Sequence, residues 1–355
     1  MTRPPHVAVV GAGIVGASIA WHLAQAGATV TLVEAGTAGG LATGASFAWI
    51  NASWGNPHPY FRLRTRSMAD WRRLGAALPD LPLAWCGGLL WDLAPDELDT
   101  YARTHGAWGY GIRPVDRAAI AALEPNLLAP PARAVHVAGE GAVEARAAAL
   151  ALVADAARRG ARLLTGSFVR ALATLGGTVV GIETAAGRIG ADAVVLAAGV
   201  ATPALAATAG AMVPLAPRPG LLIESAPSTP LLNGIVIAPE LELRQAADSR
   251  LVIAADFEDD AETAAHATFA RAIAMVRGVG ALTLDRHQVG LRPIPPDGFP
   301  IVGAVPGVPG LHVAVMHSGV TLAPAVGRHV TDVVLYGRHD ALFDPYGPAR
   351  FAASA

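Results

Sequence analysis

Hydrophobic and polar positions alternate in a recognisable order over the first 34 residues of the chain. Val7 to Val10 form a short apolar run that stops at Gly11, as a buried parallel strand does. From Ile14 to Ala26 apolar residues recur at helical spacing, and Gly27 follows as a helix stop. A second apolar run covers Thr29 to Val33. This pattern predicts a strand, a helix and a second parallel strand.

The turn between the first strand and the helix carries chemistry. Gly11, Gly13 and Gly16 form G-x-G-x-x-G, in which the glycines allow a tight turn, a close approach of a pyrophosphate and close packing of helix on strand. Glu34 ends the second strand, where a carboxylate can accept a hydrogen bond from a ribose hydroxyl. No basic residue follows directly, which disfavours NADP. The motif predicts a dinucleotide site and leaves NAD and FAD open.

Apolar patterns further along the chain predict more elements. Residues 145 to 159 are an alanine-rich helix closed by Gly160, and residues 187 to 199 contain a strand of alanine and valine. Between residues 216 and 287, "GLLIES", "LELRQ" and "RLVIAADF" are extended patterns separated by turn residues. The acidic residues 257–263 indicate a solvated helix start, because no second ligand cluster accompanies them as a metal site requires.

Composition excludes several classes of function. The chain has 355 residues, 53% of them hydrophobic and 15% charged, and its net charge of -2 gives no footprint for nucleic acid or an anionic membrane. We find no apolar run of about 18 residues, and the N-terminus lacks a signal-peptide cleavage site, so we expect a cytoplasmic protein without a membrane span. Cys86 is the single cysteine, which fits a reducing compartment.

The chain contains 26 arginine residues and no lysine. Any mechanism that needs a lysine amine, such as a Schiff base, is therefore excluded.

Three later stretches decide which dinucleotide is expected: "ATGASFAWINA" at 42–52, "GRIGADAVVLAAG" at 187–199, and "GLRPIPPDGFPIVG" at 290–303. With them the chain resembles, over its whole length, the superfamily of FAD-dependent amine oxidoreductases that contains D-amino-acid oxidase, glycine oxidase and sarcosine oxidase. The resemblance implies that FAD is bound and that Arg292 binds a substrate carboxylate. The implied cofactor-binding residues are Gly11, Gly13, Ile14, Val15, Gly16, Glu34, Ala35, Thr43, Gly44, Ala45, Ser46, Val169, Ala198, Gly199, Gly290, His317, Ser318, Gly319, Val320 and Thr321.

The fold class that follows is α/β: a Rossmann-type FAD-binding domain with an inserted antiparallel-sheet substrate domain. We expect the FAD-binding domain to be discontinuous. It is assigned residues 1–75, 140–215 and 288–355, and the substrate domain residues 76–139 and 216–287.

The resemblance also implies an activity, the oxidation of the C–N bond of a small amine-bearing carboxylate by hydride transfer to flavin N5. Glycine, an N-substituted glycine or a D-amino acid are the substrates considered. Related enzymes attach flavin through a histidine near Gly-Ala-Ser or a C-terminal cysteine, and neither is present, so non-covalent FAD is expected. Sarcosine-oxidase-like members use a lysine to activate oxygen. Its absence leaves open a dehydrogenase that passes electrons to a quinone or carrier protein, and an oligomer is possible.

The stretch "MHSGVTLAP" at 316–324 is expected to face the flavin. Ser318 or Thr321 is the predicted N-cap of the last helix, with Pro324 near its first turn, and the helix N-terminus supports negative charge on the flavin. His317 is either a contact in the site, and then a candidate catalytic residue with Arg292, or a packed histidine. Trp49 and Asn51 are candidate substrate contacts, and no residue is an obvious base. An aromatic active-site wall or plain core packing remains open for the nearby residues Trp54, His58 and Tyr60.

Overall fold

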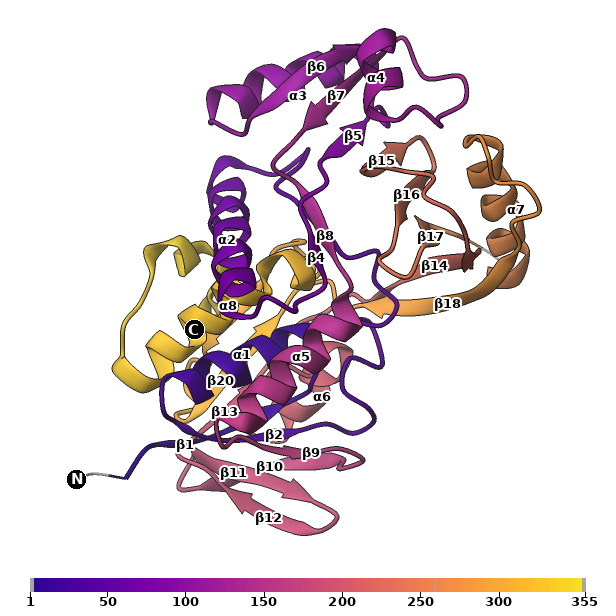
Figure 1. Ribbon diagram of the computed structural model, residues 1–355. Coiled ribbons are helices and arrows are strands. Elements are labelled where there is room, and N and C mark those ends of the chain that lie inside the picture. Colours follow the sequence, from indigo (N-terminus) through magenta and orange to yellow (C-terminus); the bar gives the residue numbers. More distant parts are fainter. Residues whose placement is uncertain (1–2, 259, 353–355) are drawn as a thin grey trace.

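The computed structural model describes residues 3–258 and 260–352 of the chain. A six-stranded sheet forms its lower half in Figure 1, with the strand order β19-β20-β13-β1-β2-β9. All neighbours in this sheet run parallel except β19, which is antiparallel to β20. Its strands are β1 (His6–Val10), β2 (Thr29–Val33), β9 (Arg162–Leu164), β13 (Ala193–Leu196), β19 (Ile301–Ala304) and β20 (Leu311–Val315).

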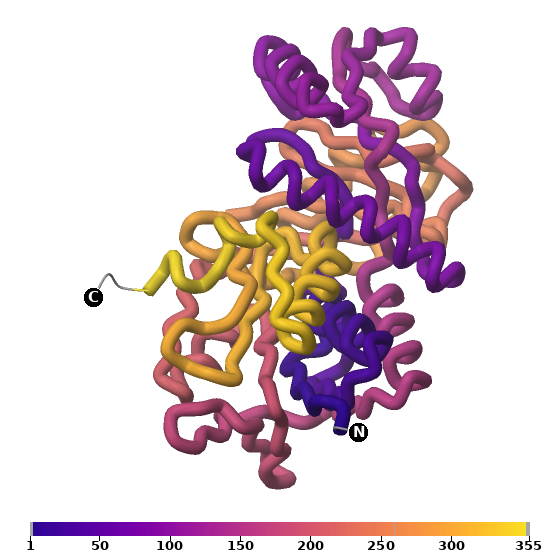
Figure 2. The backbone as a smooth tube through the Cα atoms, turned by 90° about the vertical axis from the view of Figure 1, so that its left-hand side faces the viewer, coloured from indigo at the N-terminus to yellow at the C-terminus, as the bar shows by residue number. Residues whose placement is uncertain are grey.

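Helices from three distant parts of the chain pack together beside this sheet: α1 (Ile14–Gln25), α5 (Ala145–Arg158) and α8 (Gly319–Tyr336). The yellow C-terminal helix lies next to the indigo N-terminal helix in both views (Figures 1 and 2). Gly327 makes this approach possible, because a Cβ there would lie 2.5 Å from Ser18 Oγ. Ser18 Oγ donates to the Ala323 carbonyl at 2.7 Å, so the two helices are also joined by a buried hydrogen bond.

A second, eight-stranded sheet forms the upper half, in the order β18-β14-β17-β16-β15-β5-β7-β6. Only β5 and β15 run parallel; the other neighbours are antiparallel. Its strands are β5 (Gly88–Leu90), β6 (Ile112–Asp116), β7 (Arg133–Val137), β14 (Arg218–Pro227), β15 (Ile235–Ala238), β16 (Leu241–Gln245), β17 (Arg250–Ala255) and β18 (Leu284–Arg292). α3 (Pro95–Ala107), α4 (Arg117–Leu123) and α7 (Ala261–Ala274) accompany it.

Smaller elements complete the fold. β3 (Trp49–Ile50), β4 (Leu83–Ala84) and β8 (Gly141–Val143) form a three-stranded sheet, as do β10 (Val169–Leu175), β11 (Thr178–Thr184) and β12 (Gly187–Gly190). The remaining helices are α2 (His58–Ala77), α6 (Thr202–Ala207) and the 3₁₀ segments Gly199–Ala201, Ala341–Tyr346 and Pro348–Phe351.

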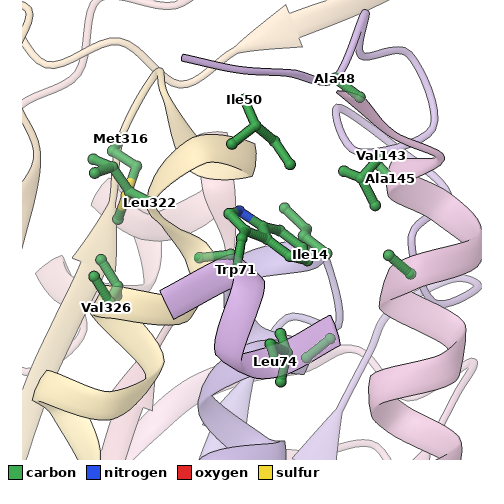
Figure 3. Packing of buried hydrophobic residues seen from close by; sticks show 14 of the residues in the cluster. Ile14, Ala48, Ile50, Trp71, Leu74, Val143, Ala145, Met316, Leu322 and Val326 are labelled. Carbon is green, nitrogen blue, oxygen red and sulfur yellow. The ribbon is translucent and has the colours of Figure 1, made fainter. Parts of the chain in front are cut away.

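The main core lies where α2 meets α8 and α1. Trp71 of α2 is fully buried, and Figure 3 shows its ring among Ile14, Ile50 and Leu322. The Trp71 ring N–H donates to the Val320 carbonyl at 2.9 Å. That carbonyl lacks its usual partner, because the residue four positions on is Pro324, which has no N–H. Trp71 thus compensates for a proline inside α8.

The predicted fold class is confirmed: a parallel Rossmann-type sheet is combined with an inserted, mainly antiparallel sheet. α1 and α5 end within one residue of the predicted ends, each followed by a glycine of positive φ, Gly27 and Gly160. The acidic segment starts α7, with Asp260 accepting from Thr263 N at 2.7 Å. The expected domain boundaries stay predictions; β18 spans the one placed at residue 288.

Candidate active site

A cavity of about 1330 Å³ is lined by residues of both sheets. Ligand pockets for small molecules commonly have about 300–1,000 Å³, so this cavity has room for an extended cofactor together with a small substrate. It begins at the glycine turn after β1, passes the start of α8 and reaches the inner face of the eight-stranded sheet.

The glycine turn has the geometry that a bound pyrophosphate needs. Gly11 has φ +99°, and a Cβ there would lie 2.5 Å from the Ala197 carbonyl oxygen. At Gly16 a Cβ would lie 1.9 Å from the Gly11 carbonyl oxygen, so only glycine lets α1 pack against the turn. Gly13 has φ −67° and lines the cavity beside Thr43, whose hydroxyl accepts from Ile14 N at 3.0 Å. The backbone is therefore open to a ligand at the α1 N-terminus.

Glu34 is fixed at the end of β2 by backbone donors. Its carboxylate accepts from Ala12 N and from Gly36 N, each at 2.8 Å. Each carboxylate oxygen of Glu34 keeps a lone pair for one more donor. Glu34 and Ala35 both line the cavity, so a ligand can reach this carboxylate. The expected ribose contact fits this arrangement.

The Gly-Ala-Ser stretch packs against the end of β18. Gln288 Nε2 donates to the Gly44 carbonyl at 2.6 Å, and a Cβ at Gly290 would lie 2.7 Å from the Ala45 Cβ. The absence of a side chain at Gly290 thus lets the two sheets meet at this point. Thr43, Ala45 and Ser46 line the cavity, whereas Gly44 does not.

The start of α8 forms another part of the wall. Helix α8 begins at Gly319 with Ser318 as N-cap, but the Ser318 side chain makes no capping hydrogen bond. Thr321 Oγ1 instead donates to the Trp49 carbonyl at 3.1 Å. The first N–H groups of a helix have no partner within it, and residues 317–321 all line the cavity. Pro324 lies in the second turn, one turn later than predicted.

His317 lies in the cavity wall as a neutral imidazole. Burial lowers its pKa to about 4, and the positive charges of Arg292 and Arg64 act in the same direction. At neutral pH the ring therefore carries no charge.

Arg292 reaches from β18 across the inner face of the sheet. Its Nη2 donates to the Pro219 carbonyl at 2.7 Å and to Asp256 Oδ1 at 2.6 Å. Gly220 leaves room for the guanidinium, because a Cβ there would lie 3.1 Å from Arg292 Nε. A substrate carboxylate would compete with Asp256 for Nη2. Asp256 could not be predicted as the partner, since the two residues are 36 positions apart.

Arg64 is a cavity-lining residue that sequence reasoning missed. It is 6% exposed, its Nε and Nη2 donate to the Asn51 carbonyl and to Asn51 Oδ1 at 2.9 and 2.5 Å, and its Nη1 donates to Ser318 Oγ at 2.5 Å. Among the described residues it has no carboxylate within ion-pair distance. The apolar pattern of α2 does not distinguish Arg64 from the other arginines of the helix. Arg64 and Asn51 are 13 residues apart and come into contact only in the folded chain.

Glu242 in β16 and Asp92 after β5 also line the cavity and were missed. Burial raises the pKa of Glu242 to about 7, and the nearby charges of Asp92 and Asp256 add to this effect, whereas Arg292 opposes it. Burial also raises the pKa of Asp92. In the alternating stretch "LELRQ", Glu242 and Arg244 share one face of β16. This alternation could have predicted that Glu242 lies on the face opposite the apolar core.

Trp49 and Asn51 line the cavity as expected for substrate contacts, although their polar groups already have partners. The Trp49 ring N–H donates to Glu140 at 2.9 Å, and Asn51 holds Arg64 and Ser53. Three neighbouring aromatic residues do not form a wall of the active site. None of them lines the cavity, and each packs against another aromatic ring. They are Trp54 on Tyr101, His58 on Trp108, and Tyr60 on Phe299.

Of the residues expected to contact cofactor or substrate, all but Gly16 and Gly44 line this one cavity. Ala198 lies beside the glycine turn, where a Cβ at Gly11 would be 2.9 Å from its Cα, and Val169 and Gly199 line the same cavity. No group of three or more potential ligands that could hold a metal occurs in residues 3–258 and 260–352. No helix in the same part of the chain is long and apolar enough to cross a membrane.

A Rossmann-type sheet with a glycine turn, an acid at the end of the second strand and a second sheet across the cavity are typical of a dinucleotide-dependent oxidoreductase. The comparison with known families makes this specific: residues 6–333 match the family described as FAD dependent oxidoreductase. The chain belongs to this family, and FAD is its cofactor.

Individual relatives agree with this assignment. The chain is 31% identical to a glycine oxidase of Pseudomonas aeruginosa over 371 residues, which covers 97% of this chain and 98% of the relative. A crystal structure of glycine oxidase from Geobacillus kaustophilus superposes with a TM-score of 0.87 at 26% identity, covering 98% and 99% of the two chains. A D-amino acid dehydrogenase of Cereibacter sphaeroides is 33% identical over 187 residues, 49% of this chain and 42% of that protein.

Proposed function

We propose that this FAD-dependent enzyme oxidises the C–N bond of a small amine that carries a carboxylate. The observation that carries the proposal is Arg292, a guanidinium in the cavity wall opposite the cofactor residues. Arginine is suited to this role because its planar fork matches a carboxylate. The similarity to glycine oxidases supports the same substrate class.

Bound FAD would supply the acceptor for the hydride that leaves the carbon next to the amine. The protein's own residues then bind and orient. Arg292 holds the substrate carboxylate in competition with Asp256, so that positioning contributes much of the catalysis. The N-terminus of α8 places unpaired N–H groups at the cavity, where they favour negative charge on the cofactor.

Neutral His317 can accept or donate a hydrogen bond at the substrate without contributing charge. We therefore assign it a contact role and keep its part in catalysis as a proposal.

The test is a panel of amine carboxylates mixed anaerobically with the FAD-loaded enzyme, with glycine, N-alkyl glycines and D-amino acids as members. Bleaching of the flavin absorbance by at least one of them is expected, because reduction of the cofactor does not depend on the acceptor. If the yellow protein stays oxidised with every member, the proposal is wrong.

A second candidate is a dehydrogenase that passes electrons to a quinone or carrier protein. It is favoured by the absence of lysine, since no lysine amine can promote the reaction of reduced flavin with oxygen. After substrate reduction, the rate of hydrogen peroxide formation is compared with the rate of dye reduction. Peroxide at the turnover rate supports the oxidase, and dye reduction without peroxide supports the dehydrogenase.

A further inference from the structure

The inner face of the eight-stranded sheet presents an ordered row of residues to the cavity. Strand pairing aligns Glu242 with Ala254 on one side and with Ile237 on the other. Ala254 is aligned in turn with Leu222, and Leu222 with Gln288. All five line the cavity, and Glu242 is the one charged residue among them. A carboxylate therefore lies in the middle of a mostly apolar wall.

Glu242 makes no hydrogen bond or ion pair with any residue of the described ranges 3–258 and 260–352, although protein surrounds it closely. Apolar surroundings disfavour the charged form of a carboxylate that has no partner, which is why the pKa of Glu242 is raised. Its neighbours Leu241 and Leu243 pack into the core on the other face, so the strand itself does not need a glutamate here. A costly group without a structural use, placed in a cavity, indicates a role in ligand binding.

Two arginines at this end of the cavity have carboxylate partners, whereas the Arg64 guanidinium is bound by Asn51 and Ser318. Arg292 pairs with Asp256 at 2.6 Å, and Arg271 pairs with Glu240 at 2.9 Å. Asp92 makes no ion pair within the described part of the chain. The Glu242 and Asp92 carboxylates therefore have no arginine partner among the described residues, and both line the same cavity as Arg292.

Glu242 is separated from the Arg292–Asp256 pair by sheet geometry. Asp256 follows Ala254 by two residues, and Ala254 is paired with Glu242. With strands about 4.8 Å apart and about 3.4 Å per residue, the Cα atoms of Glu242 and Asp256 are about 8 Å apart. A ligand with its carboxylate at Arg292 would thus meet Glu242 with a different part of the molecule.

We propose that the substrate carries a second cationic group at the end opposite its carboxylate, as a basic amino acid does, and that Glu242, with Asp92 beside it, binds this group. This inference rests on the proposed function, because it takes Arg292 as the carboxylate site. A cationic ligand would stabilise the ionised form of Glu242, whereas a neutral side chain would not.

The experiment measures binding of two ligands that have no α-amine and cannot be oxidised, 4-guanidinobutanoate and pentanoate, by the change in flavin absorbance of the FAD-loaded enzyme. We expect wild type to bind the guanidino ligand at least about tenfold more tightly. Glu242→Gln should reduce this ratio to about twofold and leave pentanoate binding equal or tighter. Glu224→Gln, on the same face of the sheet but paired with Arg286 and outside the cavity, is the control and should keep the wild-type ratio.

The inference is overturned if wild type shows no preference for the guanidino ligand, or if the preference survives in Glu242→Gln. Should Glu242→Gln lose its flavin, Asp92→Asn takes its place and must lower the same ratio. Failure of the proposed function looks different: no amine carboxylate, basic or neutral, bleaches the flavin. Bleaching by neutral amino acids in preference to basic ones retains the function and refutes the cationic substrate.

Discussion

The two walls of the cavity are built in different ways. The wall on the six-stranded sheet consists of backbone and small residues close together in sequence, such as Gly11 and Gly13, with Glu34 about 20 residues on. The wall on the eight-stranded sheet consists of side chains from strands far apart, such as Arg292 and Glu242. A cofactor shared by a large family can be bound by a fixed local turn, whereas substrate specificity depends on side chains that vary without changing the fold.

The largest effect, a loss of FAD binding, is expected from Gly16→Ala, which lies behind the cavity wall on the six-stranded sheet. The new Cβ would lie 1.9 Å from the Gly11 carbonyl oxygen, a backbone atom that cannot move without opening the turn. Purified protein should be nearly colourless, and titration with FAD should show a loss of affinity of more than 100-fold. The control is Gly190→Ala, where the nearest atom to the new Cβ is 3.9 Å away. A yellow Gly16→Ala protein with normal FAD affinity would contradict the role of the glycine turn in FAD binding.

In the wall on the eight-stranded sheet, Arg292→Ala should raise KM for a carboxylated amine about 100-fold while FAD stays bound. The loss corresponds to about 3 kcal/mol, as for a charge-assisted hydrogen bond. Steady-state kinetics and the flavin spectrum measure both parts. Arg286→Ala removes another arginine of β18 that does not line the cavity and should keep KM within twofold. Equal KM values for wild type and Arg292→Ala would remove Arg292 from the site.

Arg64 joins the segment after β3 to the start of α8, and its loss should affect stability more than substrate choice. Arg64→Met leaves the Asn51 carbonyl and Ser318 Oγ without their arginine donor, while Asn51 Oδ1 keeps its hydrogen bonds from Ser53. We expect the free energy of unfolding to fall by about 2–3 kcal/mol, by the cost of unsatisfied buried groups. Urea unfolding of the FAD-loaded protein measures it. Arg62→Met, on the exposed face of α2, should change it by less than about 0.5 kcal/mol.

The smallest effect concerns the pH dependence of His317. Its pKa of about 4 means that the folded protein keeps the ring neutral as pH rises from about 5.5 to 8. His317→Gln should therefore leave the shape of the pH–kcat/KM profile in that range unchanged, even if the absolute rate falls. A step near pH 6.5 in wild type that is absent from His317→Gln would show that the imidazole titrates at its ordinary pKa.

The sequence alone determined the glycine turn and the elements around it, because they depend on short-range patterns, and the fold class and FAD followed from the family resemblance. The period of apolar residues predicted β1, α1, β2 and α5 to within one or two residues, and glycine spacing predicted the turn, since only residues without a Cβ fit there. Arg292 and the start of α8 were found through family resemblance and do line the cavity.

The rest of the site was decided by tertiary structure. Asp256 is the partner of Arg292 because β14 and β17 bring them together across Gly220, and Arg64 is a cavity residue because α2 packs on α8. Glu242 looks like an ordinary polar position in an alternating strand until the sheet places it in a cavity without a partner. Contacts of this kind depend on strand order and register, which no local pattern encodes. The identity of the cofactor therefore followed from the sequence, whereas the charged residues that line the cavity opposite the glycine turn followed from the fold.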